Sequence, residues 1–106
     1  MRFKKIFNDK RKLNDYHYYP SKEDADYKDF LLIDKTLRKK LKIKRIEKIH
    51  GIYSLLWKYS ILSIYFTLVY DESYGIFLTG EKEEDEKLLD IIIEKLSMSL
   101  DAFDNR

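Results

Sequence analysis

The chain contains no cysteine and little glycine or proline, with three glycines and one proline among 106 residues. Without cysteine it has no disulfides, no thiolate metal ligands and no thiol nucleophile. The absence of cysteine also fits a reducing compartment, so we expect a cytoplasmic protein. The scarcity of glycine and proline indicates that most of the chain lies in regular secondary structure with short connections.

The sequence also lacks an apolar segment suited to a secretion signal or a membrane span. Basic side chains interrupt the N-terminal residues 1–12, so we expect no signal peptide. Residues 52–70 are rich in Ile, Leu and aromatic side chains, but Lys58 lies near the middle of this segment. Its Tyr and Trp residues are spread along the whole length rather than gathered at the two ends. We therefore do not expect a membrane span, and association with a membrane through residues 52–70 stays a third hypothesis.

The length of the chain is that of a single ordinary domain, and 44% of its residues are hydrophobic, which is enough for a folded core. We divide it into a basic, Tyr-rich N-terminal arm (1–20), one α+β domain (21–100) and a frayed tail (101–106). The sequence leaves open whether the arm is ordered.

The first helix is expected to begin at Ser21, whose hydroxyl can cap it, and acidic residues follow that suit the positive end of the helix dipole. The apolar spacing predicts an amphipathic helix that ends near residues 40–42. The residues of this stripe are Tyr27, Phe30, Leu31, Leu37 and Leu41. Residues 41–50 stay open between helix and strand, because Leu41 and Ile43 alternate whereas Gly51 suits a helix end.

Strands are predicted at 52–58 and 60–70, which are dense in β-branched and aromatic side chains. A turn at 71–75 and a strand at 76–78 complete a hairpin, and a second helix follows Gly80. Its first turns carry the acidic run 81–86. Its apolar stripe is Leu89, Ile92, Ile93, Leu96 and Leu100. We therefore predict an α+β fold in which an N-terminal and a C-terminal helix flank a small antiparallel sheet of two to four strands, in the order α-β(2–4)-α, with the strand order open.

We find no pattern that indicates catalysis or metal binding. The two histidines, His17 and His50, do not have the spacing of metal ligands. No serine lies in a glycine-bordered turn of the kind that holds a nucleophile, and isolated glycines cannot form a phosphate-binding loop. We therefore predict that the protein is not an enzyme and uses no cofactor or metal.

Charge is distributed unevenly along the chain. Residues 1–58 hold 17 Lys and Arg against 8 Asp and Glu, whereas residues 59–106 hold 4 against 11. The strongest local feature is the basic run 35–48, in which eight cations accompany Glu47 alone. Either the two halves attract each other within one fold, or the basic run forms a face for an acidic partner.

The basic run and the N-terminal tyrosines supply the candidate contacts with a partner. Lys and Arg neutralise phosphates and tyrosines stack on bases in nucleic-acid complexes, while Tyr and Arg also anchor protein interfaces. The candidate residues are Lys35, Arg38, Lys39, Lys40, Lys42, Lys44, Arg45, Tyr16, Tyr18 and Tyr19.

We favour a protein partner over nucleic acid. Our hypothesis is a non-enzymatic protein that acts by binding another protein, as an inhibitor, immunity or accessory protein of bacterial or phage type. The alternative is a non-specific nucleic-acid-binding protein that uses the basic run 35–48. Self-association, in which the basic run meets the acidic run of a second copy, stays open.

Overall fold

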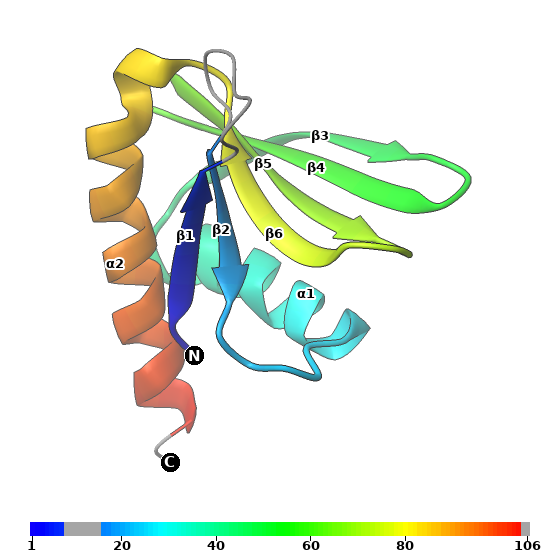
Figure 1. The fold of residues 1–106 in the computed structure, drawn as a ribbon. Coiled ribbons are helices and arrows are strands. Elements are labelled where there is room, and N and C mark those ends of the chain that lie inside the picture. The colour runs from blue at the N-terminus through cyan, green and yellow to red at the C-terminus, as the bar shows by residue number, and fades with distance from the viewer. Residues whose placement is uncertain (8–15, 105–106) are drawn as a thin grey trace.

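A computed structural model describes residues 1–7 and 16–104, in which two α-helices lie against one face of a curved antiparallel sheet (Figure 1). The strands are β1 (Phe3–Phe7), β2 (Tyr16–Pro20), β3 (Lys44–His50), β4 (Ser54–Ile61), β5 (Ile64–Asp71) and β6 (Gly75–Gly80). Helix α1 (Tyr27–Lys35) continues as a π-helical turn, η1 (Thr36–Lys40); a 3-10 turn, η2 (Glu83–Asp85), leads into α2 (Glu86–Asp104). The strand order is β1-β2-β6-β5-β4-β3.

The α+β class is confirmed, but the predicted number of strands and the predicted order of elements along the chain, α-β(2–4)-α, are wrong. The described residues form six strands instead of two to four, and the chain begins with two strands instead of a helix. Both N-terminal strands are only five residues long, and polar residues interrupt their apolar pattern: Lys4 and Lys5 in β1, and His17 in β2. Within the predicted arm (1–20), residues 3–7 and 16–20 form two strands that pair with each other and, through β2, with β6, while residues 8–15 lie outside the described residues.

The core lies between the two helices and one face of the sheet. The strand register places four buried side chains in one row across the sheet: Tyr18, Leu78, Leu68 and Trp57. Phe30 of α1 packs edge-on against Trp57, with the ring centroids 4.7 Å apart. The Tyr18 hydroxyl donates a hydrogen bond to Asp90 of α2. Both helices therefore cover the same face.

Helix α1 begins later than predicted, because Asp26 and not Ser21 caps it. The Asp26 carboxylate accepts hydrogen bonds from the backbone N–H groups of Lys28 and Asp29, at 3.0 and 3.3 Å. The Asp29 carboxylate in turn accepts from the Asp26 N–H at 3.0 Å, which completes a capping box. The backbone N–H of Ser21 donates to the carbonyl of Arg2, so this residue joins the chain to the start of β1.

The predicted end of the first helix, near residues 40–42, is confirmed. The turn η1 ends at Lys40, and Lys42 adopts a left-handed conformation with φ 58°. This conformation lets the Ile43 N–H return to the Leu37 carbonyl at 2.9 Å, as in a helix C-cap. The residues that the sequence left open between helix and strand then form β3, a sheet edge with a bulge between Arg45 and Glu47.

The predicted hairpin at 71–75 is confirmed as the turn between β5 and β6. The Asp71 carboxylate accepts hydrogen bonds from the N–H groups of Ser73 and Tyr74, and Gly75 has φ 78°. The predicted strand 60–70 is instead divided by a tight turn, because Leu62 and Ser63 have positive φ values of 51° and 66°. All five residues of the predicted stripe on α2 are buried.

Candidate binding groove

The basic run follows α1 and η1 and turns into β3 at Lys42. All six lysines of the run are exposed; Lys48 Nζ lies 4.5 Å from the centroid of the Trp57 ring, and the other five are Lys35, Lys39, Lys40, Lys42 and Lys44. Within the part of the chain that the structure describes, none of these five side chains makes an ion pair or a hydrogen bond. The run therefore presents cations whose charge is not neutralised by the described fold.

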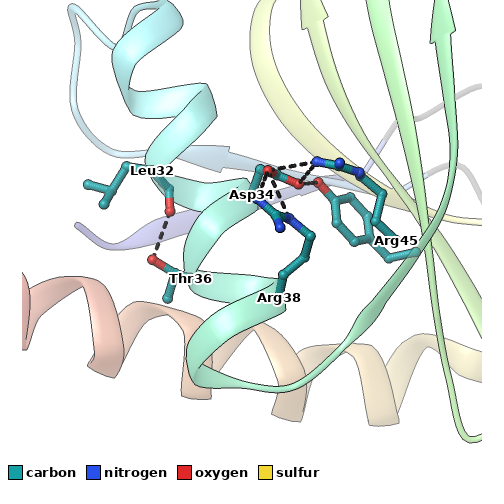
Figure 2. A network of polar contacts seen from close by, with 6 residues as sticks. Leu32, Asp34, Thr36, Arg38 and Arg45 are labelled. Carbon is teal, nitrogen blue, oxygen red and sulfur yellow. Dashed lines mark hydrogen bonds and ion pairs between the residues drawn. The ribbon is translucent and has the colours of Figure 1, made fainter.

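The two arginines of the run are used internally. Figure 2 shows Arg38 and Arg45 converging on Asp34, a residue of α1 that is only 3% exposed. Arg38 donates to Asp34 Oδ2 from Nε and Nη2, at 3.1 and 2.9 Å, and Arg45 Nη1 lies 2.9 Å from both carboxylate oxygens. The buried Tyr59 hydroxyl adds a hydrogen bond of 2.7 Å to Asp34 Oδ1. This network ties α1, η1, β3 and β4 together.

The network keeps Asp34 ionised in spite of its burial. Burial alone raises the pKa of a carboxyl, but the hydrogen bonds from Arg38, Tyr59 and Arg45 outweigh it, so the pKa of Asp34 lies below its ordinary value. Burial, and then the hydrogen bond to Asp34, raise the pKa of Tyr59. The charge of Asp34 is therefore matched within the fold and is not available to a ligand.

The π-helical turn η1 carries Lys39 and Lys40. Its defining hydrogen bond joins the Leu41 N–H to the Thr36 carbonyl at 3.1 Å. The Thr36 hydroxyl donates to the Leu32 carbonyl of α1 at 2.7 Å, as Figure 2 shows. A π turn is wider than an α turn and is often found at functional sites. Here it sets the direction in which the two lysines leave the helix.

A groove of about 460 Å³ lies between this turn and the C-terminal end of α2. Lys35, Lys39 and Lys40 line it together with the hydroxyl-bearing residues Thr36 and Ser99. Its apolar lining comes from Leu32, Ala102 and Phe103. The groove therefore combines cations of the basic run with apolar side chains, some of which come from α2.

A second depression continues the groove along α1. It shares Leu32, Lys35 and Phe103 with the first and adds the exposed side chains of Lys28 and Leu31. Lys22, Asp26 and Asp29 also line this depression, and Lys22 is paired with Asp29 at 3.1 Å. We call the two depressions together the lysine groove.

The three candidate tyrosines lie away from the lysine groove. Tyr16 and Tyr18 are 1% and 3% exposed on the core face of β2. The Tyr16 hydroxyl donates to the Lys82 carbonyl at 3.1 Å, and burial raises the pKa of Tyr16 to about 12. Tyr19 lies on the opposite face of the same strand, with its ring 5.2 Å from that of Phe77. We therefore leave Tyr16 and Tyr18 out of any contact surface.

Part of the charge imbalance between the two halves is satisfied inside the fold. Arg2 and Lys5 of the N-terminal half pair with carboxylates of α2: Arg2 with Glu94 and Lys5 with Asp90, both at 3.0 Å. Lys58 of β4 lies 3.7 Å from Glu81. Attraction between the halves thus explains these residues, while the exposed lysines around the groove need another explanation.

The histidines are dispersed over the fold. His17 stacks on Phe77 at 4.7 Å on one face of the sheet, and His50 stacks on Trp57 at 6.5 Å at the β3 edge. Among residues 1–7 and 16–104, no group of three or more His, Asp or Glu side chains is arranged to hold a metal ion. In the same residues, neither helix has the length and apolar character needed to cross a membrane.

Sequence reasoning missed the apolar half of the groove. Leu32, Ala102 and Phe103 fall outside the two stripes predicted to face the core. A signal was present, because apolar residues that remain on a helix after its core stripe is accounted for mark a second contact face. On α2 the same signal extends to Leu88, Ile91 and Met98, all of which are exposed.

Comparison with known proteins finds no relative of this chain. No family model matches the chain, and no curated protein or solved structure matches it either.

Proposed function

We propose that the protein acts by binding another protein, and that the lysine groove is the binding site. The observation that carries the proposal is the combination of exposed, unneutralised lysines with an apolar lining in one groove. A segment that fills it must bring carboxylates for the rim and apolar side chains for the floor. The partner is therefore an acidic protein segment that also carries apolar residues.

The features of the groove support a protein more than a nucleic acid. Leu32 and Ala102 offer nothing to a phosphate backbone, whereas they can pack against an apolar side chain. Arg38 and Arg45 are held by Asp34, which leaves lysines as the exposed cations of the run. Base stacking by Tyr16 and Tyr18 would require the core to open.

In this proposal, the exposed charges affect the rate of association with the partner more than the affinity of the complex. Exposed lysines attract and orient an acidic partner and raise its association rate, while the buried apolar contacts slow its dissociation. The proposal contains no catalytic step. It describes a cytoplasmic inhibitor, immunity or accessory protein that works by occupying a partner's surface.

The test is capture of partners from the native host with the tagged chain after nuclease treatment, read by mass spectrometry. The test variant is Lys39→Glu with Lys40→Glu, which reverses the rim of the groove. The matched control is Lys4→Glu with Lys82→Glu, which makes the same change in charge at exposed positions outside the groove.

We expect a protein that the wild-type chain and the control variant retain in equal amount and that the groove variant loses. Equal retention by the groove variant would move the binding site elsewhere and refute the proposal. If every captured protein disappears on nuclease treatment, and a purified oligothymidylate binds with a steep salt dependence, the chain is instead a nucleic-acid-binding protein.

A further inference from the structure

A second apolar stripe runs along the outer side of α2. The core stripe of this helix is buried, but Leu88, Ile91 and Met98 are 38%, 52% and 59% exposed. Side chains three, four or seven positions apart lie on the same side of an α-helix. Ala102 follows Met98 at such a spacing, and it also lines the lysine groove. The outer stripe therefore leads directly into the groove.

The spacing along this stripe is that of a helix that packs against another helix. Positions 88, 91, 95, 98 and 102 alternate steps of three and four residues, which is the heptad spacing of helix pairs. The polar member is Lys95, whose aliphatic stem can cover a neighbouring apolar side chain while its ammonium group reaches water. The outer side of α2 thus lacks a partner helix within the described chain.

Opposite charges lie at the two ends of the stripe. At the N-terminal end, Glu84 is exposed and Asp85 is half-buried, both close in sequence to Leu88, and the exposed Lys87 lies beside them. At the C-terminal end, Lys39 and Lys40 line the groove beside Ala102. Helix α2 has 19 residues, so roughly 27 Å separate the two ends. Figure 1 shows this helix running along one side of the molecule.

We propose that a second copy of this chain occupies the lysine groove, through an antiparallel pairing of the two α2 helices about a two-fold axis. A face that is acidic at one end and basic at the other, with apolar side chains on both sides of the central Lys95, is complementary to itself when it is turned end for end. Each acidic end then meets the lysines of the other copy, and Leu88 and Ile91 pack near Met98 of the other copy. A two-fold axis makes every such contact twice.

This inference rests on the proposed function, because it names an occupant for the same groove. Two helices of this length bury on the order of 1,000 Å² in total, which is at the lower end for a specific protein interface. The dimer is therefore weak and depends on concentration. An acidic partner protein competes with the second copy, so self-association regulates access to the groove.

The experiment is sedimentation equilibrium of the full chain over a concentration series, with variants of the stripe and of its charged ends. We expect Ile91→Asp to remove the dimer, because it places a carboxylate in the middle of the apolar contact. The control Leu62→Asp, at a residue that is 79% exposed in the β4–β5 turn, keeps the dimer.

Charge reversal provides the specific test. One variant carries Lys39→Glu with Lys40→Glu, and the other carries Glu84→Lys with Asp85→Lys. Each variant alone should weaken the dimer about tenfold or more, because every reversed contact occurs twice. An equimolar mixture of the two variants should restore it, because each acidic end again faces lysines. Restoration also shows that both variants are folded.

Failure of the inference can be separated from failure of the proposed function. A chain that stays monomeric at every concentration, or a dimer that is insensitive to Ile91→Asp or to charge reversal, refutes the inference. A synthetic helical peptide of glutamate and leucine is then added to the monomer as a probe. If it binds and Lys39→Glu with Lys40→Glu abolishes the binding, the proposed function stands without the dimer; if it does not bind, the proposed function falls as well.

Discussion

Replacing Asp34 with alanine should be among the most destabilising single changes outside the apolar core. The carboxylate accepts hydrogen bonds from Arg38, Arg45 and Tyr59, and it is almost fully buried. Breaking a buried ion pair typically costs 3–5 kcal/mol, but the side chains of Arg38 and Arg45 are 33% and 23% exposed and can turn to water. The buried Tyr59 hydroxyl would lose its acceptor. We therefore expect a loss of about 3 kcal/mol in the free energy of unfolding.

Urea unfolding followed by circular dichroism measures this loss, with Tyr59→Phe as the matched variant. Removing the hydroxyl alone leaves Asp34 with both arginines, so that change should cost only about 1 kcal/mol. The double variant should cost little more than Asp34→Ala, because the two changes remove the same hydrogen bond. A loss for Asp34→Ala that is no larger than that for Tyr59→Phe would refute the assignment of this network as a source of stability.

The same residue makes stability depend on pH in a defined direction. Because the pKa of Asp34 is lower in the folded chain than in the unfolded chain, its contribution is complete above the unfolded value, near 4. It is lost as the pH falls from there through the folded pKa. Asp34→Asn should remove this part of the acid dependence, which unfolding curves recorded at a series of pH values would detect. An unchanged dependence would mean that other carboxylates account for it.

Three further changes test the fold and the groove by the same unfolding measurement. Gly80→Ala should cost about 1–3 kcal/mol, because a Cβ at Gly80 would lie 2.5 Å from the Tyr16 hydroxyl oxygen and 3.0 Å from a Leu89 methyl carbon. An unchanged free energy of unfolding would show that the side chains of Tyr16 and Leu89 can move to accommodate the added methyl group. Lys42→Gly should be neutral or stabilising by up to about 1 kcal/mol, because glycine adopts positive φ without the steric cost that lysine pays. A clear loss would reveal a structural role for the Lys42 side chain. Lys39→Glu with Lys40→Glu should change stability by no more than about 0.5 kcal/mol, since both side chains are exposed. A larger loss would mean that binding experiments with this variant report folding instead.

The elements with a long periodic pattern could be predicted from the sequence. The core stripe of α2 repeats over three turns of helix, and each of its members is buried. The β5–β6 hairpin was predictable because the Asp71 carboxylate and Gly75 supply the chemistry that such a turn needs. These features are local, so neighbouring residues contain the necessary information.

The N-terminal strands could not be predicted, because their partners are distant in sequence. Tyr18 is buried only because β2 pairs with β6 and because its hydroxyl can donate a hydrogen bond to Asp90 of α2. Nothing near Tyr18 in the chain distinguishes it from an exposed tyrosine, so the sequence alone predicts it as a candidate contact. Strand register and strand order depend on contacts between residues that are distant in sequence, so a local sequence pattern does not determine them.

The candidate site was predictable in its charge and not in its shape. The basic run was visible, but Arg38 and Arg45 have the same charge as the exposed lysines and differ from them in their distance from Asp34. The opposing wall of the groove comes from α2, more than fifty residues further along the chain. Only the folded chain shows which cations are neutralised and which border an apolar surface.

The π turn makes the groove depend on the length of the chain as well as on its residues. The hydrogen bond from Leu41 to Thr36 spans one residue more than an α-helical bond does. A π turn holds one residue more than an α turn, so deleting a single codon within η1 would let the helix close as an ordinary α-helix while the residues after the deletion keep nearly the same direction. A deletion in α1 instead would rotate Lys39 and Lys40 by about 100° relative to the residues before it, although neither lysine had been substituted. Whether a lineage keeps this groove therefore depends on where in the helix a residue is lost, which a percentage of sequence identity does not record.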